Sequence, residues 1–109
     1  MSQFHAHVNL DPDTRATVPW VLDVQSRLLE SLATRMVLPL VPQAAPSGLG
    51  RRTAIERLNP VLTIDGQICC AVTQALFAMP KNLLGSSVAD LSQAPWEIIA
   101  ALDCLLSGV

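Results

Sequence analysis

Two short apolar segments around an Asp-Gly pair constrain this fold more than any other part of the sequence. Residues 61–64 read Val-Leu-Thr-Ile, and residues 67–73 read Gln-Ile-Cys-Cys-Ala-Val-Thr. A two-residue turn between antiparallel strands needs positive φ at both central positions, which Asp tolerates and Gly adopts without strain. Asp65-Gly66 therefore predicts a tight β-hairpin between these two segments.

Strand patterns also precede the hairpin. Residues 3–8 alternate polar with apolar side chains, and residues 20–26 form a second strand-like segment. Residues 35–41 are almost continuously apolar, which is typical of a well-buried strand. Pro39 has no backbone N–H to give to a neighbouring strand, so it predicts an edge or a bulge at that point.

The segments between these strands are expected to be loops and short turns. Pro, Gly or Asp interrupt residues 9–17 and 42–59, which favours loops there. Residues 27–33 predict a loop or a short helical turn. Residues 74–91 give mixed signals, because Met79-Pro80 interrupts them.

The end of the chain carries the one clear helix pattern. Its large apolar side chains recur at spacings of three and four residues: Ile98, Ile99, Leu102, Leu105 and Leu106. Ser92 is the expected N-cap, Pro95 and Glu97 suit the first turn, and Gly108 is expected just after the last turn. Five or so antiparallel strands and one terminal helix predict a mainly β domain, either a small barrel or a strongly curved sheet.

Composition limits the class of protein further. With 109 residues, a single domain over residues 1–109 is expected. Charged residues make up 15% of the chain and hydrophobic residues 50%, against about 25% charged in an average domain. This excess of apolar side chains suggests that a partner or a second copy covers part of the surface.

Charge and targeting signals argue against other classes. The net charge of −2 gives no basic surface for nucleic acid. No apolar stretch reaches the roughly 20 residues that span a membrane, and the first residues lack the pattern of a signal peptide. We therefore expect a cytoplasmic protein without a membrane segment.

Residues with chemical potential do not assemble into a recognisable catalytic or metal motif. Cys69, Cys70 and Cys104 lack metal-ligand spacing and predict buried free thiols. His5 and His7 share one face of a strand, where a polar surface explains them better than a metal site. Ser, His and Asp are all present, but without a nucleophile-elbow or phosphate-loop context. The residues favour a binding protein that needs no metal or cofactor over an enzyme.

Five short segments resemble the CcdB-type toxins in sequence and in order. They are Asp23-Val24-Gln25-Ser26, residues 35–40 (Arg-Met-Val-Leu-Pro-Leu), Asn59-Pro60-Val61, residues 88–92 (Val-Ala-Asp-Leu-Ser) and Gly108-Val109. Phe4 also matches a Phe near the family's N-terminus. The resemblance covers essentially the whole chain, and the chain is therefore similar to the CcdB family.

This resemblance implies a fold, a function and partners. It implies an SH3-like barrel with a C-terminal helix, and a homodimer. It also implies the toxin of a type II toxin–antitoxin module that binds the A subunit of DNA gyrase, traps the DNA-cleaved complex and performs no chemistry itself. A CcdA-like antitoxin would neutralise it with a disordered segment that folds on the toxin and takes part in autoregulation of the operon. DNA would then be contacted only through the antitoxin or gyrase.

The resemblance also implies two sets of binding residues. The gyrase-binding set is Ser26, Leu28, Leu29, Asp103, Leu106, Ser107, Gly108 and Val109. The antitoxin-binding set comes from the loop after the first strand and the loop before the hairpin: Asn9, Asp11, Asp13, Arg15, Gly48, Arg51 and Arg52. Ser107 departs from the family, because the type member has Trp before the terminal Gly. The departure leaves three outcomes open: recognition of a divergent gyrase, weak binding, or loss of toxicity.

Two alternatives follow from these residues. A MazF-type RNA endonuclease would share the barrel and would use Arg35 and the arginines within residues 51–57 at the RNA groove, although the acidic net charge counts against it. A non-toxic CcdB relative would bind the antitoxin alone and help to regulate its operon.

Overall fold

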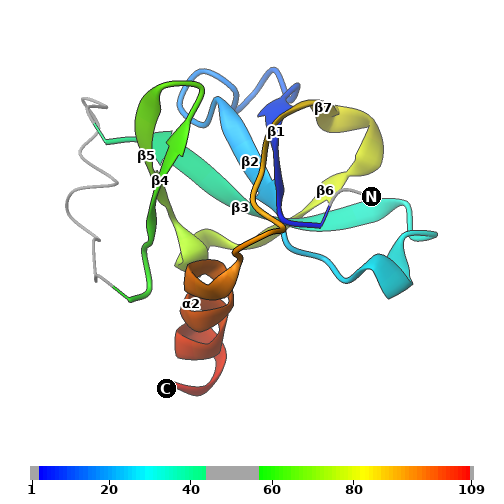
Figure 1. Cartoon of the computed structure of the whole chain (residues 1–109). Coiled ribbons are helices and arrows are strands. Elements are labelled where there is room, and N and C mark those ends of the chain that lie inside the picture. Colours follow the sequence, from blue (N-terminus) through cyan, green and yellow to red (C-terminus); the bar gives the residue numbers. More distant parts are fainter. Residues whose placement is uncertain (1–2, 44–56, 109) are drawn as a thin grey trace.

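The computed structural model describes residues 3–43 and 57–108 of the chain. Within them, seven antiparallel strands form one curled sheet, and a helix follows at the C-terminal end (Figure 1). The elements in chain order are β1 (His5–Asn9), β2 (Trp20–Asp23), the 3₁₀ turn η1 (Arg27–Leu29), β3 (Thr34–Pro42), β4 (Val61–Ile64), β5 (Gln67–Ala71), η2 (Thr73–Ala75), β6 (Phe77–Pro80), η3 (Lys81–Leu83), β7 (Leu84–Asp90) and α2 (Trp96–Ser107). The predicted mainly β class with a curved antiparallel sheet and one terminal helix is confirmed.

The predicted hairpin is present at the expected residues. β4 and β5 pair antiparallel, with Ile64 opposite Gln67. Asp65 has φ of 51° and Gly66 has φ of 80°, so both turn residues have the positive φ that this connection requires. The adjacent Cys69 and Cys70 are buried free thiols, as predicted, and Cys104 is a half-buried free thiol.

β3 is the central strand of the sheet, which corrects the expectation of an edge at Pro39. The strand order is β4-β5-β3-β2-β1-β7, and β6 also pairs with β3. β3 pairs with β6 over Thr34–Val37 and with β5 over Leu40–Pro42. Pro39 lies between these two pairings, where its carbonyl accepts from the Val72 N–H at 2.9 Å. Because N and C=O of a strand residue point to the same side, the missing Pro N–H faces the break between the two partner strands.

Apolar side chains pack against both faces of the central strands. On one face, Leu22 and Leu38 join a cluster that includes Ile64 and Ile98. On the other face, Val21 and Val37 pack with Met79. The continuous apolar run in β3 was predicted as a well-buried strand, and burial on both faces confirms that prediction.

The second half of the sheet has more strands than the sequence patterns predict. Met79-Pro80 predicts an interruption but belongs to β6, and Leu84–Asp90 forms the whole of β7. β7 pairs with β1, and the register between them shifts twice. Gly85 lies at the second shift, where an added Cβ would come within 2.9 Å of both Val8 Cβ and Val8 O. The absence of a side chain therefore permits this close approach of β7 to β1.

The start of α2 differs from the sequence prediction, whereas its end agrees. The helix begins at Trp96 with Pro95 as N-cap, so Ser92 is not the cap. Ser92 instead gives its backbone N–H and its hydroxyl to the Asp90 carboxylate, at 2.9 and 2.6 Å. Gly108 ends the helix with φ of 75° and donates its N–H to Cys104 O, as a C-terminal Gly was expected to do.

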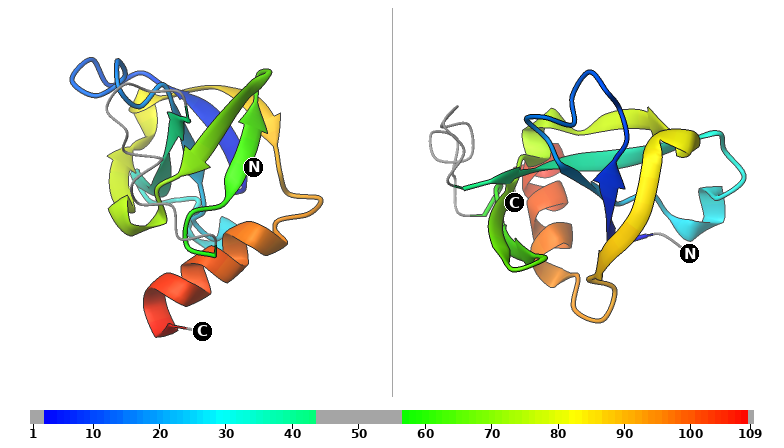
Figure 2. Two further views of the ribbon diagram at one scale, coloured as in Figure 1. Left: turned by 90° about the vertical axis from the view of Figure 1, so that its left-hand side faces the viewer. Right: turned by 90° about the horizontal axis from the view of Figure 1, so that it is seen from above.

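α2 places only part of its apolar face against the sheet. Ile98 and Ala101 are buried, and Leu102 packs at the edge of the core. The C-terminal half extends away from the strands (Figures 1 and 2), and Leu106 is exposed there. No helix in the described part of the chain is long and apolar enough to cross a membrane.

We predict that Gly85→Ala destabilises the protein by about 1–3 kcal/mol, because the new methyl group must displace the Val8 backbone. Urea unfolding followed by tryptophan fluorescence measures the effect. The exposed neighbour Ser86 supplies the control, and Ser86→Ala should stay within about 0.5 kcal/mol of the wild type. Equal unfolding midpoints for the two variants would contradict the close approach.

Candidate partner-binding site

The turn η1 holds large aliphatic side chains in water. Ser26 begins the turn, and its hydroxyl oxygen accepts the Leu28 N–H at 3.2 Å. Leu29 donates its own N–H to Ser26 O at 3.0 Å. The side chain of Leu28 is 93% exposed, and those of Leu29 and Leu32 are 47% exposed. Ser26 therefore orders a turn whose leucines face solvent together.

A buried ion pair lies beneath this turn. Arg35 on β3 donates from Nε to Asp23 Oδ2 on β2 at 2.8 Å, and from Nη2 to Asp23 Oδ1 at 3.3 Å. The Asp23 and Arg35 side chains are 0% and 2% exposed. Bidentate pairing fixes the orientation of the two groups as well as their separation. Arg35 is thus committed to Asp23 and is not available at the surface for RNA, as the ribonuclease alternative would need.

Gln25 connects the ion pair to η1. Its backbone N–H donates to Asp23 Oδ1 at 2.9 Å, and its carbonyl accepts from Arg35 Nη2 at 3.3 Å. Its side-chain Oε1 accepts the Met36 N–H at 3.0 Å, and its Nε2 donates to Leu29 O at 3.1 Å. Gln25 therefore ties the exposed turn directly to the ion pair and to β3.

The second part of the predicted gyrase-binding set lies at the last turn of α2. Asp103, Leu106, Ser107 and Gly108 are all exposed. The Ser107 hydroxyl donates to Asp103 O at 2.8 Å, so it satisfies a carbonyl of its own helix. Figures 1 and 2 show this turn well apart from η1. The fold therefore does not join the two parts within one chain, and Val109 lies outside the described residues.

The predicted antitoxin loop is organised by a residue that is itself buried. Asn9 donates from Nδ2 to Thr14 Oγ1 at 3.0 Å and to Val18 O at 2.8 Å. Its Oδ1 accepts the Asp11 N–H at 2.9 Å. Because Asn9 is only 1% exposed, it supports the loop from beneath.

Other members of the predicted antitoxin set differ in their access to solvent. Asp13 and Arg15 are exposed, and Asp11 is half-buried. Asp11 accepts the Asp13 N–H at 3.0 Å through Oδ1, which holds the loop tip in a turn. Gly48, Arg51 and Arg52 lie outside the described residues.

Comparison with known families identifies the family of this chain. A family model described as CcdB protein matches residues 3–108, nearly the whole chain. The chain belongs to the CcdB family. This membership makes it a toxin of the toxin–antitoxin class. The sequence resemblance identified the same family from its five ordered segments.

Side-chain contacts of two histidines link β1 to β7 in this CcdB-family toxin. The His5 Nδ1 lies 2.9 Å from Ser87 Oγ, and its Nε2 lies 3.3 Å from Asp90 Oδ1. The two hydrogen bonds from Ser92 are the main reason that the pKa of Asp90 is lowered, and His5 contributes a smaller lowering. His7 bonds through Nδ1 to Gly85 O at 3.0 Å. His5 is half-buried and fits the polar sheet face that the sequence predicted, whereas His7 is buried.

Sequence patterns missed the role of Gln25 and of the Asp23–Arg35 pair. Both charged residues lie in strand-like, largely apolar segments, where an unpaired charge would be costly to bury. That conflict was the available signal that they pair with each other. Among the described residues, no group of three or more His, Cys, Asp or Glu side chains is placed to hold a metal ion.

We predict that the hydrogen bonds from Ser92 to the Asp90 carboxylate stabilise the fold in a pH-dependent way. The Asp90 pKa is lowered in the folded protein, so the ionised carboxylate is favoured by folding. This contribution is present above the usual carboxyl pKa of about 4 and is lost as the pH falls through the lowered folded value. Ser92→Ala should therefore lower the urea midpoint at pH 7, and the difference from wild type should shrink toward pH 2.5. Ser86→Ala is the control, and a constant difference for Ser92→Ala at every pH contradicts this origin.

Proposed function

We propose that this toxin binds the A subunit of DNA gyrase and traps the enzyme with its DNA cleaved. The exposed leucines of η1 carry the proposal. A large aliphatic side chain that is 93% exposed, as Leu28 is, gains from being covered by a partner. The bonds from Ser26 and Gln25 hold the turn in place, so little ordering is required when the partner binds.

The proposed activity is binding and not catalysis. Two groups with potential for acid–base or electrostatic catalysis have structural roles: Arg35 is paired with Asp23, and His5 lies between Ser87 and Asp90. A poison of this kind needs a rigid complementary surface. The turn η1 on its buried ion pair supplies one.

We further propose that the toxin is a homodimer that uses the apolar side of α2. Leu106 and Trp96 are 78% and 70% exposed, and Leu102 and Leu105 are half-buried on the same helix. A second copy covering this helix would remove the apolar surface that the composition already indicates. The last turn of α2 would then complete the gyrase-binding set with Asp103, Ser107, Gly108 and Val109.

A CcdA-like antitoxin is the proposed neutralising partner. Its contacts on the described loop are Asp11, Asp13 and Arg15, positioned by Asn9, and the proposed set also includes Gly48, Arg51 and Arg52. Their mixed charges suit a charged, disordered segment that folds on binding. DNA is reached only through this antitoxin or through gyrase.

The direct test incubates the purified toxin with its own host's gyrase, ATP and supercoiled plasmid, followed by detergent and protease. Linear DNA is the expected product. Leu28→Ala should raise the toxin concentration needed by about tenfold, because interface truncations of this kind cost about 1–2 kcal/mol. Ile68→Ala is the control, because Ile68 is also an exposed aliphatic residue (54% exposed) and lies on the β4–β5 hairpin, outside η1. Sedimentation equilibrium of the same sample should give twice the 11.7 kDa chain mass.

The absence of both linear DNA and A-subunit binding would exclude gyrase poisoning. Retained antitoxin binding in that case would support the non-toxic relative, which Ser107 favours because it presents no large side chain at the exposed end of α2. Sequence-specific cleavage of single-stranded RNA would support the ribonuclease alternative instead.

A further inference from the structure

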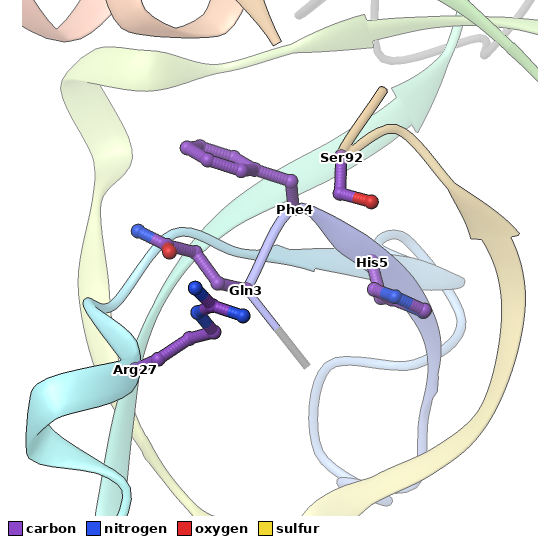
Figure 3. A pocket seen from close by; sticks show the side chains of 5 residues that line it. All are labelled: Gln3, Phe4, His5, Arg27 and Ser92. Atoms are coloured by element: carbon purple, nitrogen blue, oxygen red, sulfur yellow. The ribbon is translucent and has the colours of Figure 1, made fainter. Parts of the chain in front are cut away.

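A polar pocket lies beside η1, between the N-terminal segment and the loop that leads into α2. Its volume is about 360 Å³, and its lining residues are Gln3, Phe4, His5, Arg27 and Ser92 (Figure 3). A volume of this size is sufficient for a small ligand or a partner side chain. One lining residue is cationic, and none carries a carboxylate. Arg27 is therefore the one formally charged side chain, with His5 counted as neutral, among those that line the pocket.

Arg27 is the source of this charge. Its side chain is exposed, and no ion pair joins it to a carboxylate in the part of the chain that the structure describes. Asp90 does not line the pocket, and its Oδ1 is engaged by Ser92, through two hydrogen bonds, and by His5 Nε2 at 3.3 Å, so it is not paired with Arg27. A guanidinium with free donors matches a carboxylate in a bidentate arrangement.

Phe4 provides a wall that is fixed before any ligand arrives. Its φ is 65°, which is an outlier for a bulky side chain. Two backbone bonds hold it there: Phe4 N–H donates to Asp23 O at 2.6 Å, and Leu91 N–H donates to Phe4 O at 2.9 Å. The ring also packs against the core. Figure 3 shows the Arg27 guanidinium beside the Gln3 side chain and Phe4 next to Gln3, on the side toward Ser92.

Coverage of η1 by a partner has a consequence for Arg27. Arg27 is the first residue of the turn and directly precedes Leu28 and Leu29. A protein surface that buries these leucines also removes water from Arg27. Burial of an unpaired guanidinium is costly, so the partner must bring an anion to this point.

We propose that the pocket binds an Asp or Glu side chain of the gyrase A subunit, with Arg27 pairing with the carboxylate. The Gln3 amide, whose Nε2 makes one long contact of 3.5 Å to Val24 O, offers its second N–H. This inference rests on the proposed function for the identity of the partner. It adds the chemistry of the contact: the partner surface that covers the η1 leucines carries an acidic residue at its edge. Arg27 of the pocket and the exposed Leu28 and Leu29 belong to the same turn.

The test measures the dissociation constant of the full-length toxin and the A subunit for Arg27→Lys, Arg27→Gln and Arg27→Glu. Binding should weaken in that order, by about tenfold for Gln and roughly 100-fold for Glu, since breaking a desolvated interfacial charge pair is among the costlier changes. Lys retains the charge but not the planar fork, so it should fall between wild type and Gln. Arg57→Glu, at an exposed arginine before β4 that does not line the pocket, controls for the change in net charge.

Salt provides a second readout of the same pair. Wild-type binding should weaken as NaCl rises, and this dependence should be smaller for Arg27→Gln. If the wild type binds and Arg27→Glu binds as tightly as Arg57→Glu, the pocket inference is wrong while the proposed function stands. If the wild type binds no A subunit at all, both are wrong.

Discussion

The bidentate pair between Asp23 and Arg35 is the interaction on which the exposed turn η1 depends. Burial of two opposite charges contributes little net stability, because desolvation offsets their attraction. Its effect is geometric: it fixes β2 against β3 at one point and orients Gln25, whose backbone bonds to both partners. From there, one side-chain bond reaches Leu29. A buried charge pair and an exposed leucine are thus only two hydrogen-bonded steps apart.

This arrangement is consistent with the proposal that a small, weakly charged chain acts by binding. The sheet buries both faces of its central strands, and the hydrogen bonds of Gln25 connect β3 to the exposed turn η1. The C-terminal half of α2, with the exposed Leu106, extends away from the strands and lies apart from η1 (Figure 1). Two separate apolar surfaces on one chain fit a protein with more than one partner, and they account for the high apolar content of the sequence. Membership of the CcdB family gives these surfaces their toxin–antitoxin setting.

Local signals in the sequence were sufficient where backbone geometry alone decides the structure. Asp65-Gly66 and Gly108 have the positive φ that their positions predict. Predictions failed where another part of the structure decided the outcome. Ser92 bonds to Asp90 and so does not cap α2. Pro39 lies within a central strand because β5 and β6, which pair with different parts of β3, meet at this residue. The pocket side chains come from three separate segments, and no spacing along the chain indicates that Arg27 and Ser92 line the same space.

Amide hydrogen exchange in Gln25→Ala tests the central claim most directly. If Gln25 holds η1 in place through its bonds to the Asp23–Arg35 pair and to Leu29, the Met36 and Leu29 amides should exchange faster in this variant. Met36 loses its acceptor, and Leu29 lies in the turn that Gln25 anchors. Amides of the β4–β5 hairpin, which Gln25 does not contact, should exchange as in the wild type. Unchanged protection at both Met36 and Leu29 would contradict the account.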